Sequence, residues 1–391
     1  MLGPEILELA KKGFQVQATV GGKAIEDYSE ALERHRHSRD LFRHFRLFQA
    51  LKLALKDEYF QGTNIFGKYW TGEALVGLFL HEVKRRADES CGQTRNAVVL
   101  GRPVRLADDP AKDLLLQARF RDACLLAGFG EVHFVLEPIA AMASLIGEEE
   151  GRTLLFDFGG GTLDITVADL SAEGVELLSS AGIDLGGYIL DEDISRARII
   201  RHFGYGGHFK TMTGKSLEIP SWITNQVASF YALPLSDIAK TRQVIRDLMH
   251  DADKKAALRG LNEFLDRNLA FGLFRLIDEA KIALSSEPTA DVSFDVPPHV
   301  ALHETLTRPD FEAIIAGRVL AAKNLVLKAV ADAGIETGEI AHVVRVGGSS
   351  RIPLFVEMLE QLFPGKVREG EVYTSISAGL LRAHRLGFSR T

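Results

Sequence analysis

Cysteine is scarce in this sequence, since Cys91 and Cys124 are the only two among 391 residues. Their separation fits no common metal-binding spacing, which indicates free thiols in a reducing compartment. Long apolar runs are missing as well, because none approaches the roughly 20 residues that cross a bilayer. The segment before Gly21 carries Lys11 and Lys12 after its apolar part, the reverse of a secretory signal. These absences predict a cytoplasmic protein with no membrane partner.

A strong excess of charge of either sign is also missing. The formal net charge is −7 and the pI is about 6.0, which argues against binding of nucleic acid or a membrane surface along the whole chain. A basic run from Arg34 to Arg46 contains five arginines and is interpreted as a solvated helix face or a linker. His35 and His37 within it are two residues apart, so a helix would not bring them to one face, and no metal site is predicted there.

Two familiar phosphate-transfer motifs are incomplete. Thr213-Gly214-Lys215-Ser216 has the form of the end of a P-loop, but Phe209 stands where the first glycine is required. Asp157-Phe158-Gly159 spells a protein-kinase tripeptide, without the strand lysine and the catalytic loop of a kinase. Both P-loop NTPases and protein kinases are therefore excluded.

The sequence does contain a glycine-rich stretch between two strand patterns, residues 154–167. The apolar run that ends at Phe158 has strand character, Gly159-Gly160-Gly161 predicts a tight turn, and the alternation from Leu163 onwards predicts a half-buried second strand. Consecutive glycines can point several amides into one concavity, which suits phosphate oxygens. Asp157 and Asp164 flank the turn and are suited to Mg²⁺, directly or through its waters. The predicted hairpin favours Mg²⁺–nucleotide binding, and an ordinary polar turn is the alternative.

A strand–helix–strand pattern precedes this hairpin. Predicted strands at 97–100 and 132–136 enclose a helix at 111–127 that Gly128 closes. This spacing implies a right-handed crossover and parallel pairing. Glu137 then lies at the carboxyl end of a parallel strand, where α/β folds place ligands. The alternative is an acid favoured by the dipole at a helix N-terminus.

Two further glycine turns follow strand patterns. Gly186-Gly187 comes after a strand-like run that begins at Val175, and Gly347-Gly348 comes after a strand at 342–346, before a helix in whose first turn Pro353 lies. Helix N-terminal amides beside glycines suit a polar or anionic ligand. Further helices are predicted at 67–89, 273–284, 310–333 and 374–386.

Taken together, six motifs in order resemble the ATPase domain of the DnaK-type heat-shock chaperones, the Hsp70 family within the actin/hexokinase superfamily. They are Leu136–Pro138, Phe156–Asp164, Leu185–Gly187, Asp278–Ser286, Leu306–Phe311 and Val346–Pro353. The tail at 373–380 is similar to the divergent YegD-like branch. The resemblance implies an α/β, actin-like (RNase H-like) two-lobed fold that binds ATP or ADP with Mg²⁺ between its lobes.

The resemblance also implies roles for single residues. It assigns the β- and γ-phosphates to Gly159, Gly160, Gly161 and Thr162, and hydrated Mg²⁺ to Asp157 and Asp164. Glu137 would orient the waters of the metal or the attacking water, so that Glu137, Asp157 and Asp164 are the candidate catalytic residues. Lys281 and Ser285 would reach the ribose and adenine. The other implied nucleotide contacts are Gly186, Gly187, Gly347, Gly348, Ser349 and Arg351, with Lys52 as a further candidate for a phosphate-facing lysine.

The sequence departs from the family pattern at several places. No Asp-x-Gly-Thr hairpin, which in the family clamps the phosphates from the other lobe, precedes Ala97, so the fold is expected to lack that hairpin. Ile282 replaces the usual adenine-stacking arginine, which removes cation–π support for the base. Tyr373 replaces the usual acid. Because the sequence ends at Thr391, we expect no peptide-binding domain.

The predicted domains are lobe I at 1–150, lobe II at 151–363 with a helix-rich inserted subdomain at about 189–275, and a segment at 364–391 that returns to lobe I. The first functional hypothesis is a DnaK-like protein that binds Mg²⁺–ATP and hydrolyses it slowly. The second is a truncated or degenerate relative that acts as a non-catalytic binding or scaffold module, or a mis-started reading frame. A sugar or acetate kinase of the same superfamily is a third, although no acceptor-substrate motif is found.

Overall fold

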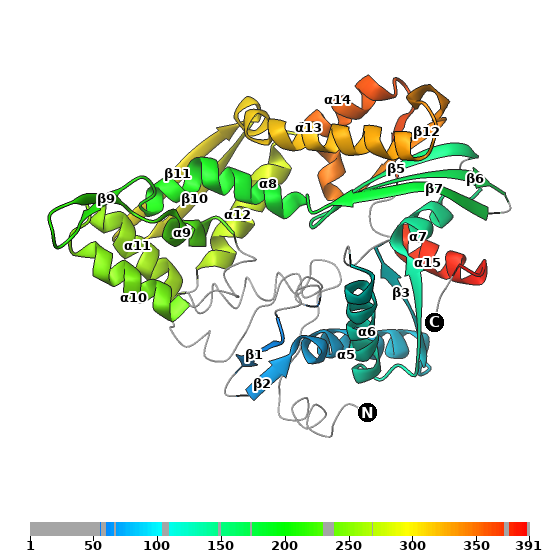
Figure 1. Cartoon of the computed structure of the whole chain (residues 1–391), viewed down its shortest axis with the longest axis horizontal. Coiled ribbons are helices and arrows are strands. Elements are labelled where there is room, and N and C mark those ends of the chain that lie inside the picture. The colour runs from blue at the N-terminus through cyan, green and yellow to red at the C-terminus, as the bar shows by residue number, and fades with distance from the viewer. Residues whose placement is uncertain are drawn as a thin grey trace. The chain divides into compact units, whose positions relative to one another are not determined.

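The computed structural model describes residues 55, 60–65, 68–103, 109–147, 150–172, 174–229, 238–267, 269–370 and 375–388. The chain divides into two compact units (Figure 1). Unit 1 is Met1–Ser144 with Ile376–Thr391, and unit 2 is Leu145–Ser375. The sequence predicted boundaries at 150 and 363, whereas the division falls at Leu145 and Ile376. Residues 364–375 belong to unit 2, where β13 (Val367–Glu369) pairs with β12 (His342–Val346).

Unit 1 contains a hairpin, a parallel strand pair and packed helices. Its elements are β1 (Gly62–Ile65), β2 (Lys68–Thr71), α5 (Gly72–Cys91), β3 (Ala97–Arg102), α6 (Pro110–Leu126), β4 (Glu131–Leu136), α7 (Glu137–Ser144) and, from the C-terminal part, α15 (Ser375–Arg385). The predicted parallel pairing of β3 with β4 across α6 is confirmed.

Local sequence signals explain the ends of α6. Asp109 caps its N-terminus by accepting a hydrogen bond from the Lys112 amide, and Pro110 occupies its first turn. Gly128, with φ +94°, follows the last residues of the helix as predicted. At the other end of the unit, a Cβ on Gly379 would lie 1.8 Å from the carbonyl oxygen of Ala140, so α15 and α7 pack with their backbones in close contact.

Unit 2 is built on a mixed sheet. Its described strands have the order β13–β12–β5–β6–β7. Strand β6 (Leu163–Ser171) is antiparallel to both β5 (Gly151–Phe158) and β7 (Gly174–Ile183), and β12 is parallel to β5. Thr166 and Ala168 of β6 are buried, and so are the apolar Ile165 and Val167. The strand is therefore covered on both faces at its middle, and the predicted half-buried pattern is wrong there.

A region with many helices follows the sheet hairpins, and its status as an inserted subdomain at about 189–275 stays a prediction. Its elements and those that follow are α8 (Gly187–Ile194), the π-helical turn η1 (Ser195–Ile199), η2 (Ile200–Phe203), β8 (His208–Lys210), β9 (Ser216–Glu218), α9 (Ser221–Thr224), η3 (Asn225–Val227), α10 (Ile238–Met249), α11 (Lys255–Asp266), α12 (Ala270–Ala283), β10 (Thr289–Val296), β11 (Val300–Thr307), α13 (Arg308–Asp332), η5 (Thr337–Glu339), β12, η6 (Gly348–Arg351), α14 (Pro353–Leu362) and β13. The P-loop-like Gly214 and Lys215 lie in the exposed turn between β8 and β9.

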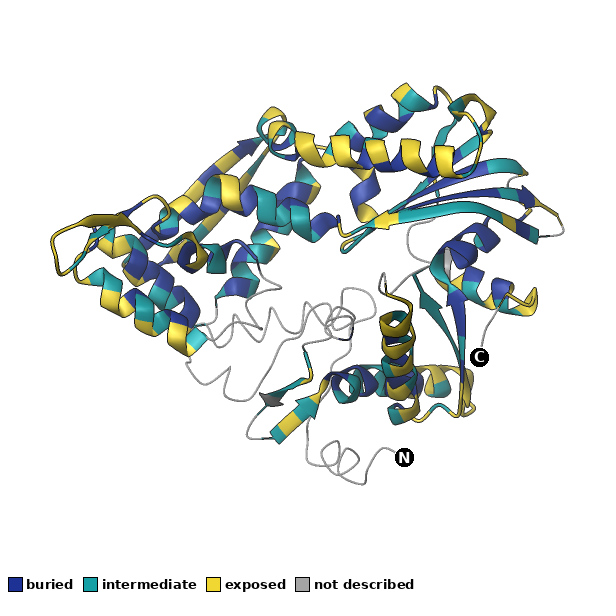
Figure 2. Cartoon of the chain, in the orientation of Figure 1, coloured by how far each residue is buried: buried dark blue, intermediate teal, exposed yellow. Residues whose placement is uncertain are grey.

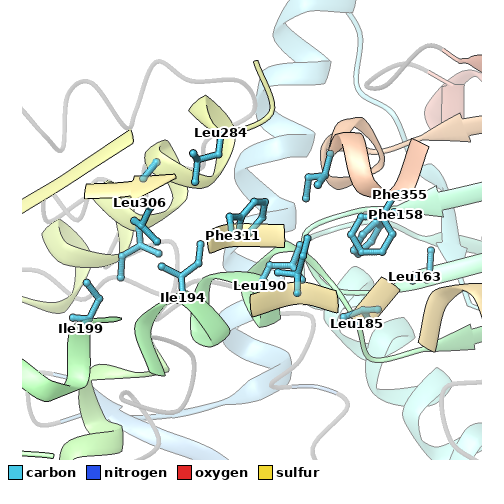
Figure 3. Close-up of a cluster of buried hydrophobic side chains, with 14 of the residues drawn as sticks. Phe158, Leu163, Leu185, Leu190, Ile194, Ile199, Leu284, Leu306, Phe311 and Phe355 are labelled. Carbon is cyan, nitrogen blue, oxygen red and sulfur yellow. The ribbon is translucent and has the colours of Figure 1, made fainter. Parts of the chain in front are cut away.

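One apolar core joins the sheet of unit 2 to its helices. Phe158 and Leu163 of the β5–β6 hairpin, Leu190 and Ile194 of α8 and Phe311 of α13 belong to one buried cluster (Figure 3). The long helix α13 buries one side and exposes the other (Figure 2). Unit 1 has a smaller core of its own, composed of Leu55, Val76, Phe120, Ala123, Cys124, Val132 and Phe134.

Two predicted boundaries are corrected. The helix predicted at 67–89 begins only at Gly72, because Lys68–Thr71 pairs with β1 as a strand and Thr71 caps the helix. The strand predicted to stop before Gly101 continues to Arg102, since it pairs with β4 to its end. Among the described helices, none combines the length and apolar character that a membrane span requires.

Candidate functional site

The predicted β5–β6 hairpin is confirmed, and its tip is the first glycine turn, Gly159-Gly160-Gly161. The amide of Gly159 donates to the carbonyl of Thr162 across the turn, at 3.2 Å. Asp157 and Asp164 are direct partners in the antiparallel register. Partners of this kind project to the same face of the sheet, with Cβ atoms about 4.5–5.5 Å apart. The hairpin therefore presents two carboxylates side by side.

Gly182 of β7 is the next residue in this row, because it is the partner of Asp164 on the other side. A Cβ at Gly182 would lie 2.3 Å from Oδ1 of Asp164, so the Asp164 carboxylate lies over the bare glycine backbone. Like charges directly opposite one another are unfavourable in a sheet. The pair of carboxylates is thus an arrangement that a bound cation would stabilise.

The second glycine turn, Gly186-Gly187, begins α8 and holds the first glycine turn from one side. The Gly187 amide donates to the Gly159 carbonyl at 3.0 Å, and the Tyr188 amide donates to the Gly160 carbonyl at 3.1 Å. A Cβ at Gly186 would lie 2.3 Å from the Gly160 carbonyl oxygen. Only glycine allows the two backbones to approach this closely.

The third glycine turn, Gly347-Gly348, follows β12 and completes the support. Gly347 has φ +84°, and a Cβ there would lie 2.3 Å from the Phe158 carbonyl oxygen. The hydroxyl of Ser349 donates to the Gly159 carbonyl at 2.9 Å. The structure therefore brings together three glycine turns from distant parts of unit 2.

These contacts fix which groups of the first glycine turn remain for a ligand. The carbonyls of Gly159 and Gly160 are bound by α8 and Ser349. In a trans peptide the N–H points opposite to the C=O, so the next amides, those of Gly160 and Gly161, point away from α8. Model Cβ atoms on all three loop glycines meet nothing within 4 Å. Two successive amides of the turn therefore point away from α8, an arrangement that suits a backbone anion site.

Lys281 of α12 lies beside the second glycine turn and is 6 % exposed. Its Nζ donates to the Gly187 carbonyl at 3.2 Å and lies 2.8 Å from Oδ1 of both Asp191 and Asp278. The Oδ1 atom of Asp191 is fully buried, so the Lys281 ammonium at 2.8 Å compensates a carboxylate charge that water does not reach there. Burial raises the pKa of Asp191 to about 6, against the lowering effect of the Lys281 ammonium. Burial also disfavours the charged Lys281, but the two carboxylates more than offset this and raise its pKa.

The remaining candidates of unit 2 have surroundings of their own. Ser285 follows α12 and is partly buried, with its amide donating to the Ile282 carbonyl. Arg351 pairs with Glu369 at 2.6 Å, and Gly348 faces open space. Ile282, in place of the expected arginine, is 61 % exposed. The role of each of these residues toward a nucleotide stays a prediction.

Glu137 belongs to unit 1, where it is the first residue of α7 at the carboxyl end of β4, as predicted. Its Cγ lies 3.1 Å from the position of a Cβ at Gly101 of β3, so the side chain packs over that glycine. Its predicted role toward a ligand of unit 2 stays a prediction. Lys52, the basic run 34–46 and Tyr373 lie outside the described residues.

Within the described ranges, no group of three or more His, Cys, Asp and Glu residues is arranged to hold a metal ion directly. The two carboxylates of Asp157 and Asp164 therefore fit the predicted binding of Mg²⁺ through its waters better than a protein cage. Sequence reasoning missed Gly182 and Asp191. A signal for Asp191 existed, because it is an acid four residues after Gly187 on an otherwise apolar helix face.

Comparison with known proteins agrees with this geometry. A family model described as "Hsp70 protein" matches residues 45–212 and 244–372. The chain is similar to the chaperone protein DnaK of Endomicrobium trichonymphae, with 26 % identity over 326 residues that cover 79 % of this chain and 42 % of DnaK. The match thus spans less than half the length of that relative. Because the family model covers most of its residues, the chain belongs to the Hsp70 family and has the actin-like α/β fold of its ATPase domains.

Proposed function

We propose that this chain binds a nucleoside di- or triphosphate with Mg²⁺, ATP or ADP by family membership, and that the phosphates contact the first glycine turn. The observation that carries the proposal is the orientation of that turn. Its two carbonyls are bound by α8 and Ser349, so its amides face outward as an anion site. Membership of the Hsp70 family supports a nucleotide as the anion.

The pair of carboxylates, Asp157 and Asp164, supports the proposed binding of Mg²⁺. Asp157 and Asp164 would hold hydrated Mg²⁺ beside the phosphates, where the ion would neutralise charge on both sides. Lys281 and Ser285 would contribute to the nucleoside part of the site, and Gly347, Gly348, Ser349 and Arg351 would form its other side. Glu137 would orient water for slow hydrolysis. The peptide-binding activity of complete DnaK-type chaperones is not part of this proposal.

Thermal unfolding and calorimetry with Mg²⁺–ADP test the proposal. Because a ligand at a hundredfold excess over its Kd stabilises the folded state by about 2.7 kcal/mol, the wild-type Tm should rise clearly. Asp157→Asn should abolish the rise by removing half of the carboxylate pair. Asp169→Asn, a matched change near the far end of the hairpin, should keep it. An unchanged wild-type Tm at millimolar nucleotide would contradict the proposed binding.

A further inference from the structure

Asp191 is a largely buried acid that the proposed function does not use. It lies on α8, one turn after Gly187, and its side chain is 14 % exposed. Burying a carboxylate costs free energy even when it is paired, and an apolar residue at this position would avoid that cost. Its partner Lys281 belongs to α12, so the contact joins two helices rather than residues of one helix.

Lys281 contacts α8 at two points of the same turn. One is the carbonyl of Gly187 and the other is the Asp191 carboxylate. The position of Gly187 matters because its amide, and that of Tyr188, bind the carbonyls that orient the first glycine turn. A displaced Lys281 would release the Gly187 carbonyl, and α8 would no longer hold the turn in its outward-facing arrangement.

Asp278 competes for the same ammonium. It lies on α12 itself, three residues before Lys281, and its side chain is 49 % exposed. Without the charge of Asp191, Lys281 would turn toward Asp278 and solvent, where its ammonium is better hydrated. The Asp191 charge is therefore what keeps Lys281 directed at Gly187.

We propose that Asp191 is a positioning residue, which acts through Lys281 and Gly187 to set the geometry of the anion-binding glycine turn. This inference rests on the proposed function for its effect on ligand affinity, but not for its effect on the backbone. The Asp191–Lys281 contact serves the site more than the stability of the fold.

The test compares Asp191→Asn with the matched control Asp278→Asn in the full chain, at about pH 8, where Asp191 is ionised. Hydrogen exchange without ligand reports the backbone directly. In Asp191→Asn, the amides of Gly159, Gly187 and Tyr188 should exchange about tenfold faster than in wild type. The control should leave them close to wild type, because its carboxylate does not join α12 to α8.

Calorimetry with Mg²⁺–ADP reports the consequence for binding. Asp191→Asn should weaken the affinity by about tenfold, while Asp278→Asn changes it by less than about threefold. Unchanged exchange in Asp191→Asn would overturn the inference, and so would faster exchange with unchanged ADP affinity. If Asp191→Asn exchanges faster but the wild-type protein binds no ADP, the proposed function is refuted and the positioning role of Asp191 is retained. Lys281→Met, which removes both contacts to α8, should show the same local exchange, and a normal pattern there would also overturn the inference.

Discussion

At the scale of the residue, Gly182 must be a glycine for a reason that its neighbours in the sequence do not reveal. It lies one residue before the end of β7 and still pairs with β6, a position where glycine is usually unfavourable. The reason is the Asp164 carboxylate, whose Oδ1 occupies the space that a Cβ would need. The glycine therefore serves the orientation of a candidate metal-binding group and not the strand.

Gly182→Ala should leave the protein folded and impair Mg²⁺-dependent binding. The added methyl group would force the Asp164 carboxylate to rotate, with a loss of about 1–2 kcal/mol in the free energy of unfolding. Mg²⁺–ADP affinity should fall by about tenfold. Calorimetry measures both this variant and Gly174→Ala, a control at the other end of β7 where a Cβ meets nothing within 4 Å. Equal affinities of the two variants would refute the role of Gly182.

At the scale of the element, the irregular η2 helix is fastened to β11 by a charged group. Glu304 is 7 % exposed and accepts hydrogen bonds from Arg201 at 2.6 and 2.7 Å, and its carboxylate lies 2.6 Å from Nε2 of His202. Burial alone would raise the pKa of Glu304, but the hydrogen bonds of Arg201 and His202 outweigh it, and the pKa is lowered.

Glu304→Gln should therefore reduce stability in a pH-dependent way. A carboxyl with a lowered pKa in the folded state stabilises the fold above its unfolded pKa, and this contribution is lost as the pH falls through the folded value. Near neutral pH the variant should lose about 2 kcal/mol, and its difference from wild type should shrink below about pH 4.5. Urea unfolding across this range measures it.

The surface pair of Glu279 with Arg275 supplies the control, since it lies largely in solvent. Glu279→Gln should change the free energy of unfolding by less than about 1 kcal/mol at any pH. A Glu304→Gln variant whose difference from wild type does not vary with pH would contradict the assignment.

The elements also show what the sequence could predict. Hairpin, crossover and long helix follow from hydrophobic period and from local signals such as Asp109, Gly128 and Pro353. The contacts that hold the first and second glycine turns in place could not be predicted in this way. Lys281 lies 94 residues from Gly187, and Ser349 lies 190 residues from Gly159. Resemblance to a family brought these segments to one site but could not show which atoms bind one another.

At the scale of the whole molecule, the candidate site residues fall into both units. The glycine turns, Asp157, Asp164 and Lys281 belong to unit 2, whereas Glu137 belongs to unit 1. The residues proposed to bind the phosphates and Mg²⁺ therefore all belong to unit 2. Slow hydrolysis, in our proposal, depends in addition on Glu137.

Glu137→Gln should separate the two activities. If Glu137 orients water, the variant should bind Mg²⁺–ATP with nearly wild-type affinity and hydrolyse it at least about a hundredfold more slowly, the usual contribution of a positioned acid or base. Phosphate release measures turnover. Glu131→Gln, at the start of the same strand β4, is the control. A wild-type rate no higher than that of the Glu137 variant would favour a non-catalytic binding module.

The glycines of the three turns differ in whether the fold tolerates alanine in their place. Gly160 and Gly161 have open space at the Cβ position and no left-handed φ, whereas Gly186 and Gly347 have backbone where the Cβ would lie. Alanine at Gly160 or Gly161 is thus compatible with the folded chain and obstructs only what approaches from outside. Alanine at Gly186 or Gly347 would clash with the backbone of the first glycine turn or of the residue before it, and would displace that turn. Gly186 and Gly347 are thus needed for the folded backbone, whereas Gly160 and Gly161 are needed only for the access of a ligand, in our proposal the phosphates.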